Sequence, residues 1–114
     1  MDVYREAYDA ALLVSKVSRR FPVQEQAELA RQLRRSARSV PANIAEGWAK
    51  RSSPAEFKRY LMVAFGSCHE TLVWLDMSRD EGYLKADEHK DLATRYDRIS
   101  IMLRNLWKNW RSFK

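Results

Sequence analysis

The chain has 114 residues, of which 46% are hydrophobic and 32% are charged, and its 21 lysines and arginines outnumber 15 aspartates and glutamates to give a net charge of +6. This length and balance, with only three glycines and three prolines, are typical of one folded domain over residues 1–114 and exclude a disordered chain. No apolar run approaches the roughly 20 residues of a membrane span and no apolar signal segment opens the chain, so we expect a cytoplasmic protein without membrane contact.

The first half of the chain shows two helical patterns. Over residues 2–19, side chains of one face recur at spacings of three and four, and Pro22 ends the pattern. The expected buried face comprises Tyr4, Ala7, Tyr8, Ala11, Leu12, Val14 and Ser15. A second pattern begins near Val23 and keeps its phase through Pro41. Its buried face comprises Leu29, Leu33, Ala37, Val40, Ile44 and Gly47. Because proline removes a backbone donor and crowds the preceding turn, this phase predicts one helix kinked at Pro41.

The second half begins with a clear helix start. Ser53 is the expected N-cap, Pro54 the first helical residue and Glu56 the third, which together form a capping box. The expected buried face is Phe57, Leu61, Ala64, Cys68, Leu72 and Leu75, until the pattern breaks at residues 79–82. A fourth helix begins at the acidic turn of residues 87–88 and buries Leu92, Tyr96, Ile99, Leu103, Leu106 and Trp110. We therefore predict an all-α fold, an antiparallel up-and-down four-helix bundle with a proline-kinked second helix.

Two blocks of sequence resemble a known family. The first is residues 39–47, SVPANIAEG, and the second comprises Arg51, Glu56, Phe57, Arg59, Tyr60, Leu61, Ala64, Gly66, Ser67 and Glu70. They resemble the signature of the 23S ribosomal-RNA intervening-sequence proteins, which are small bacterial four-helix-bundle proteins. The fold is also similar to that of the accessory protein of diversity-generating retroelements, a basic pentameric bundle that works with a reverse transcriptase and binds nucleic acid. The resemblance therefore implies a homo-oligomer, a pentamer, with a basic surface.

Four arginines of the second helix are the first candidates for nucleic-acid binding. Arg31, Arg34, Arg35 and Arg38 fall within about 100° of one helix face, away from the predicted core, with no acidic residue among them. Guanidinium groups on an exposed face can pair with phosphate oxygens. The alternative is a solubilising face with local partners such as Glu28.

The last helix carries a second basic set. Arg104, Lys108 and Arg111 share one face, and Trp107 and Trp110 interleave with them. Aromatic side chains beside arginines can stack on unpaired bases. Two alternatives stay open, because the helix dipole stabilises cations at a helix C-terminus without a ligand, and such tryptophans are often core or interface residues.

The third helix is apolar nearly all round. Opposite its core face it carries Met62, Val63, Val73, Trp74 and Met77. A four-helix bundle buries only one stripe of each helix, so a second stripe predicts a subunit interface. The alternative is that this helix is the most enclosed one of the monomer.

Within the motif, Asn43, Glu46 and Gly47 allow a reading as a binding site, but we favour a structural role. Pro41 frees the carbonyl four residues earlier, which nearby serines or Asn43 can satisfy. Gly47 allows a neighbouring backbone to approach. The expected partners of Glu46 are Arg51 and Arg59.

Enzyme chemistry is not expected. Cys68, His69 and Glu70 are consecutive, and consecutive helical residues point about 100° apart, so they cannot converge on one substrate atom. The single cysteine excludes an internal disulfide, and no metal or phosphate-loop motif is present, so we expect no metal and no cofactor. The sequence predicts a non-catalytic homo-oligomer that binds RNA or DNA through basic faces. The alternative is an adaptor or scaffold for a nucleic-acid enzyme such as a polymerase or nuclease.

Overall fold

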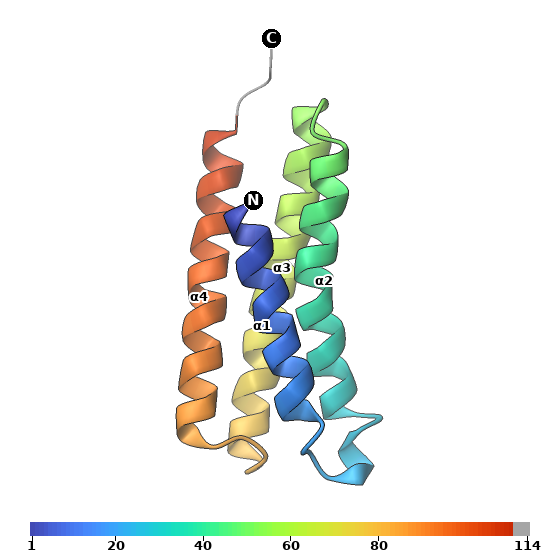
Figure 1. Ribbon diagram of the computed structural model, residues 1–114, viewed down its shortest axis with the longest axis vertical. Coiled ribbons are helices and arrows are strands. Elements are labelled where there is room, and N and C mark those ends of the chain that lie inside the picture. Colours follow the sequence, from blue (N-terminus) through green and yellow to red (C-terminus); the bar gives the residue numbers. More distant parts are fainter. Residues whose placement is uncertain (111–114) are drawn as a thin grey trace.

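The computed structural model, which describes residues 1–110, consists of long helices packed side by side (Figure 1). They are α1 (Asp2–Ser18), α2 (Leu29–Ala49), α3 (Pro54–Asp80) and α4 (Ala86–Asn109), and a short 3₁₀ turn, η1 (Val23–Glu25), lies between the first two. Both α1 and α3 contact α2 and α4, whereas α1 and α3 do not contact each other within the described residues. Consecutive helices run in opposite directions (Figure 1). The predicted all-α, up-and-down four-helix bundle is confirmed.

The connection between α1 and α2 is longer than predicted. The predicted helix start near Val23 is wrong, since α2 begins at Leu29. The preceding segment folds back on α1: Gln26 Nε2 donates to the backbone carbonyls of Ser18 and Phe21 at 2.9 and 3.0 Å. The last carbonyl groups of a helix have no partner within the helix, and these bonds satisfy the end of α1.

The predicted start of α3 is confirmed, but only half of its capping box forms. Ser53 Oγ accepts a hydrogen bond from the Glu56 backbone N–H at 3.3 Å, and Pro54 is the first helical residue. The Glu56 carboxylate does not return this bond. It pairs instead with Arg59 at 3.2 Å, because that guanidinium lies one turn ahead on the same exposed face.

Three of the four predicted buried faces are confirmed. The expected core residues of α2, α3 and α4 are buried, with Leu29, Leu72, Leu106 and Trp110 half-buried at the edges. The predicted face of α1 is confirmed in part: Ala7 and Val14 are buried and Tyr4, Ala11 and Ser15 are half-buried, while the buried set also includes Val3, Ala10 and Ser18. Tyr8 and Leu12 are 42% and 57% exposed. The prediction is wrong for these two residues, because small side chains such as Ala7 and Ala10 bring α1 close to the core, whereas Leu13 and Val17 pack against the edge of the core.

Pro41 lies inside an uninterrupted helix. The helix α2 continues through it, and Pro41 is buried together with Val40 and Ile44. Apolar packing on both sides of the proline offsets the missing backbone hydrogen bond. One continuous helix is thus confirmed, while the kink itself stays a prediction.

Candidate functional site

The motif of residues 39–47 forms a close contact between α2 and α3. A Cβ added to Gly47 would lie 2.8 Å from Tyr60 Cβ, so only glycine permits this approach. The Ser39 and Ser67 hydroxyls lie 2.8 Å apart, and Asn43 Nδ2 donates to the Ser39 carbonyl at 2.8 Å rather than to the carbonyl freed by Pro41. This geometry supports a structural role for the motif.

A second polar contact lies one turn further along the same interface. The buried Thr71 hydroxyl is 2.9 Å from Ser36 Oγ and 2.7 Å from the Ser67 carbonyl oxygen. Hydroxyl groups inside an apolar interface need hydrogen-bond partners, and these four residues have them only when Ser39 faces Ser67 and Ser36 faces Thr71. The two contacts therefore fix the register of α2 on α3.

The predicted ion pairs of Glu46 are wrong. Glu46 lies 3.4 Å from Lys50, one turn along α2, and not beside Arg51 or Arg59. The Arg51 guanidinium stacks 4.3 Å from the centroid of the Trp48 ring. Since Glu46 is exposed and its pair is local, it contributes little to a site.

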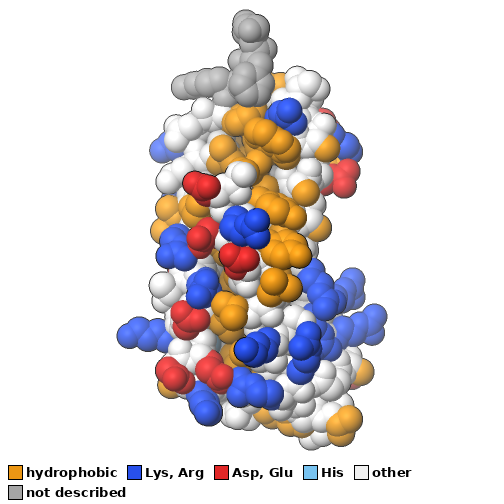
Figure 2. Space-filling view, in the orientation of Figure 1, with side chains coloured by type: hydrophobic (Ala, Val, Ile, Leu, Met, Phe, Trp, Pro, Cys, Tyr) orange, Lys and Arg blue, Asp and Glu red, His pale blue; other side chains and the backbone are white. Residues whose placement is uncertain are grey.

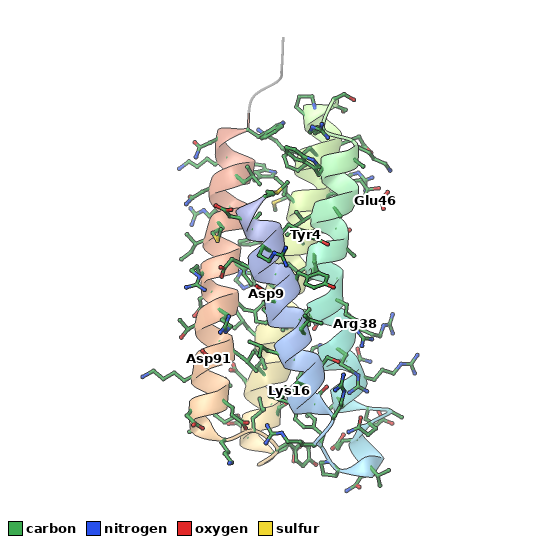
Figure 3. All side chains as sticks on the ribbon, in the orientation of Figure 1. Tyr4, Asp9, Lys16, Arg38, Glu46 and Asp91 are labelled. Atoms are coloured by element: carbon green, nitrogen blue, oxygen red, sulfur yellow. The ribbon has the colours of Figure 1, made fainter. Side chains whose placement is uncertain are left out.

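Most of the predicted arginine stripe of α2 reaches solvent. Arg31, Arg35 and Arg38 are exposed, as are Lys16 and Arg19 at the end of α1. None of the five takes part in an ion pair within residues 1–110. Lysines and arginines gather over the lower halves of α1 and α2 (Figure 2), and Arg38 points away from the bundle (Figure 3). We call these five residues the basic face.

Arg34 does not belong to the basic face, so the prediction that all four arginines reach solvent is wrong for this residue. It is half-buried, and its guanidinium donates to Ser18 Oγ at 2.9 Å and to the Gln26 side-chain and backbone oxygens at 3.3 and 3.2 Å. These bonds tie the start of α2 to the end of α1. Arg34 is thereby a structural residue in this fold.

A second, smaller basic surface lies at the opposite end of the bundle. Arg104 and Lys108 of α4 are exposed, whereas Arg111 lies outside the described residues. At the same end, Lys50 Nζ donates to the Tyr60 hydroxyl at 3.0 Å, and this hydrogen bond lowers the pKa of the Tyr60 phenol. Because Lys50 is also paired with Glu46, it adds no net charge to this surface.

The two tryptophans of α4 have different surroundings. Trp107 is exposed, lines a pocket of about 210 Å³ between α3 and α4, and lies below Lys58, whose Nζ is 5.2 Å from the ring centroid. Trp110 packs edge-on against Phe57 with ring centroids 4.6 Å apart. Of the two, Trp107 is the more exposed.

The predicted interface residues of α3 are largely exposed. Met62, Val63, Val73 and Met77 face solvent, whereas Trp74 is half-buried and donates from Nε1 to the Glu70 carboxylate at 3.2 Å. The alternative of an enclosed α3 is wrong, because this side of the helix is open. Gly66 lies among the exposed residues, and a Cβ added to it would meet nothing within 4 Å. We call Met62, Val63, Gly66, Val73 and Met77 the ridge.

A second apolar surface, which the sequence did not predict, lies between α1 and α2. Tyr4, Tyr8, Leu12, Pro41, Ala42 and Ala45 line a pocket of about 320 Å³ that ends at Arg38. We call these six residues the groove, and it appears as an orange strip beside α1 in Figure 2. Its sequence signal is the i, i+4 repeat of Tyr4, Tyr8 and Leu12 in α1, which the spacing pattern places in the core.

The side chains with catalytic potential point to different neighbours. Burial raises the pKa of the Cys68 thiol to about 12, His69 packs on Phe65, and Glu70 accepts from Trp74. Within residues 1–110, no three His, Cys, Asp or Glu side chains gather into a possible metal site. No helix in that part of the chain is long and apolar enough to span a membrane.

Comparison with known proteins finds one matching family model and solved structures of similar fold. A family model described as 23S rRNA-intervening sequence protein matches residues 1–105. The chain is similar to the crystal structure of a protein of unknown function from the S23 ribosomal protein family of Bacteroides thetaiotaomicron VPI-5482, with 25% identity and a TM-score of 0.84 over 94% of this chain and 99% of that one. No curated protein matches the chain in sequence.

Proposed function

The chain belongs to the 23S rRNA-intervening sequence protein family, and on that premise we propose that it is a non-catalytic, homo-oligomeric protein that binds RNA or DNA through its basic face. The family description makes structured ribosomal RNA the first ligand to test. Five subunits, the number implied by the resemblance to the retroelement accessory protein, and a cytoplasmic location remain predictions.

The observation that carries this proposal is the set of cations on α1 and α2 that lack acidic partners. Arg31, Arg35 and Arg38 are exposed without an ion pair in the described residues, and Lys16 and Arg19 extend the same surface. Like charges on one face repel one another, and phosphate groups would relieve that repulsion. The guanidinium and ammonium groups of this face pair with phosphate oxygens, so phosphate contacts rather than base reading would dominate.

Such binding has a quantitative signature. Each phosphate neutralised releases condensed counterions, so five contacts to a duplex imply roughly a 500-fold loss of affinity between 50 and 200 mM salt. Sequence preference would be weak, because phosphate contacts carry no sequence information. Affinity for unrelated duplexes of equal length should accordingly be similar.

The test is a salt titration of binding with an engineered basic face. In the triple variant Arg31→Glu, Arg35→Glu and Arg38→Glu, affinity for structured rRNA fragments or DNA should fall by more than 100-fold at low salt, and the salt dependence should flatten. Arg34 is left intact because it holds the α1–α2 connection together. Electrophoretic shifts or fluorescence anisotropy would measure the effect.

A matched control separates this face from net charge. The variant Arg5→Glu, Lys85→Glu and Lys90→Glu makes the same charge change at exposed positions elsewhere and should keep most of the affinity. If wild-type protein shows no salt-sensitive binding, or if both triple variants lose affinity equally, the basic face is not a nucleic-acid site.

The second candidate function is an adaptor for a nucleic-acid enzyme, and the exposed ridge of α3 favours it. Apolar side chains in one stripe are typical of protein contacts. Purification after nuclease treatment distinguishes the two functions: a retained polymerase or nuclease supports the adaptor, and nucleic acid recovered without protein supports direct binding.

A further inference from the structure

We propose that the pocket between α3 and α4 binds an unpaired base of a nucleic-acid strand, with the base against the Trp107 ring and the adjoining phosphates on cations of both helices. The pocket lies near the end of the bundle opposite the start of α2 and the basic face (Figure 1). Nucleic acid as the ligand rests on the proposed function, but the pocket is a second site with a different mode of recognition. The basic face would hold phosphates, whereas the pocket would select strands whose bases lie outside a duplex.

The pocket has the size and the lining for one aromatic ring system. Its volume is about 210 Å³, which is below the roughly 300–1,000 Å³ of pockets that enclose a whole drug-sized ligand. Apolar side chains of both helices and one cation line it, namely Leu61, Met62, Phe65, Leu103, Trp107 and Arg104. A base would enter such a pocket with its ring covered and leave its sugar and phosphate in solvent.

Trp107 provides the stacking surface. It is 38% exposed, and the Lys58 ammonium lies 5.2 Å from the centroid of its ring. Lysine carries its charge on a flexible stem, and an exposed cation–π contact is weaker than a stack of a base on tryptophan. A base that enters the pocket would therefore replace the ammonium over the ring, and Lys58 would turn to the phosphate of the same nucleotide.

A second aromatic side chain lines the pocket from α3. Phe65 is half-buried, and its ring centroid lies 4.6 Å from that of His69, one turn further along the helix. Because Phe65 and Trp107 belong to different helices, a base in the pocket would contact aromatic carbon from two directions. Two such contacts restrict the orientation of the base more than one exposed ring does.

Three cations surround the pocket without acidic partners. Arg104 lines it, Lys108 follows one turn later in α4, and Lys58 lies over Trp107 from α3. None of these cations takes part in an ion pair within the described part of the chain. The sequence has no acidic residue between positions 57 and 69 and none from position 98 onward. The surface around the pocket is therefore positive and complements phosphate groups.

The placement of these cations favours a strand over a free nucleotide. Lys58 belongs to α3, whereas Arg104 and Lys108 belong to α4, where residues one turn apart have Cβ atoms about 5–6 Å from each other. A free nucleotide brings its phosphates in one group, which cations that converge on one point would bind best. A strand brings separate phosphates before and after each base, and cations on both sides of the pocket match that arrangement.

The probes for this site are hairpins with a short single-stranded tail. One hairpin carries a tail of adenosines, and its matched partner carries abasic residues at the same positions, so that the two have equal phosphate charge. Fluorescence anisotropy at fixed salt measures both affinities. Wild-type protein should bind the adenosine tail about 10- to 100-fold more tightly than the abasic tail, which is the effect of stacking one base on an aromatic side chain.

Variants of the tryptophan test whether the ring causes this difference. Trp107→Leu keeps an apolar side chain but removes the ring, so the affinities for the two tails should become equal. Trp107→Phe keeps a ring and should retain most of the difference. Trp74→Leu is the matched control, because Trp74 does not line the pocket, and it should bind like wild type. Circular dichroism checks that each variant is folded.

Variants of the cations test the phosphate contacts. Arg104→Ala with Lys108→Ala should weaken binding of both tails by the same factor and flatten the salt dependence, because phosphate contacts do not depend on the base. Arg5→Ala with Lys90→Ala removes the same two charges at exposed positions outside the pocket and should keep most of the affinity. Equal losses in the two double variants would overturn the assignment of the phosphates to this pocket.

The remaining outcomes separate this site from the basic face. Equal affinity of wild type for the adenosine and abasic tails would refute the base pocket, even where salt-sensitive duplex binding supports the basic face. A difference between the tails that survives in Trp107→Leu would also refute it, and so would adenosine monophosphate that binds as tightly as the adenosine tail. Conversely, if the tails differ and the triple variant of the basic face binds duplexes like wild type, the basic face fails and the pocket stands. Protein that binds none of the probes would refute both.

Discussion

Gly47→Ala should destabilise the fold by about 2 kcal/mol, although alanine is the better helix former. The new Cβ would lie 2.8 Å from Tyr60 Cβ and 3.3 Å from the Phe57 carbonyl oxygen, whereas carbon atoms pack best at about 3.5–4.0 Å. Neither atom can move aside by a rotamer change, so α2 and α3 must separate. Overpacking of this kind destabilises by about 1–3 kcal/mol, and the gain in helix propensity offsets up to about 1 kcal/mol.

Gly66→Ala is the matched control, because the same substitution in α3 meets nothing within 4 Å. It should stabilise an isolated copy by about 0.5–1 kcal/mol. In a chain of this size, about 1 kcal/mol corresponds to roughly 4 °C in Tm, so the two variants should shift Tm in opposite directions. Thermal and urea unfolding by circular dichroism, at equal and low protein concentration, measures both. A Gly47→Ala variant as stable as wild type would refute the close α2–α3 contact.

Three further predictions concern buried groups. Arg34→Ala should lower the free energy of unfolding by about 1–3 kcal/mol, since it leaves the α1–α2 connection without three hydrogen bonds. Arg35→Ala, on the exposed side, should change the free energy of unfolding by less than about 0.5 kcal/mol. Urea unfolding of the two variants measures the difference. Tyr96→Phe should be neutral or stabilising by up to about 1 kcal/mol in the same assay, because the buried hydroxyl has no hydrogen-bond partner within residues 1–110. Burial raises the pKa of the Cys68 thiol from 9.0 to about 12. The stability that the neutral thiol contributes is therefore complete below pH 9 and is lost as pH rises toward 12. A difference in unfolding free energy between wild type and Cys68→Ala that does not shrink from pH 8 to pH 10.5 would contradict this.

Helix number, helix type and most of the core follow from local rules in the sequence. The Ser53 and Pro54 start signal acts within a few residues of the chain, and so does the apolar spacing of α2 that runs through Pro41. The 3.6-residue period selects the same buried face whichever partner covers it. These features are confirmed because they depend little on where the other helices lie.

The misassigned residues depend on contacts between helices. In α1, Ala7 and Ala10 are buried and Tyr8 and Leu12 are exposed, and a spacing pattern cannot distinguish a face of small residues from a face of large ones. Only the closeness of the neighbouring helices selects the small face. Arg34 differs from its neighbours for a similar reason, since its partners are Ser18 at the end of α1 and Gln26 in the α1–α2 connection, where the sequence pattern predicts a helix. The sequence therefore does not reveal the exposed apolar side chains of α1 or the hydrogen bonds of Arg34.

The nine-residue motif has two faces, and both demand small side chains. Ser39 and Gly47 lie two turns apart and meet α3 at Ser67 and Tyr60, and Asn43 between them hydrogen-bonds to Ser39 within α2. Ala42 and Ala45, on another side of the same helix, form the floor of the groove. A helix that gives small residues to two contacts loses apolar burial in that segment, and buried Val40 and Ile44 restore it. The motif of residues 39–47 therefore serves close packing, and this packing sets the position of the arginines before it relative to the ridge after it.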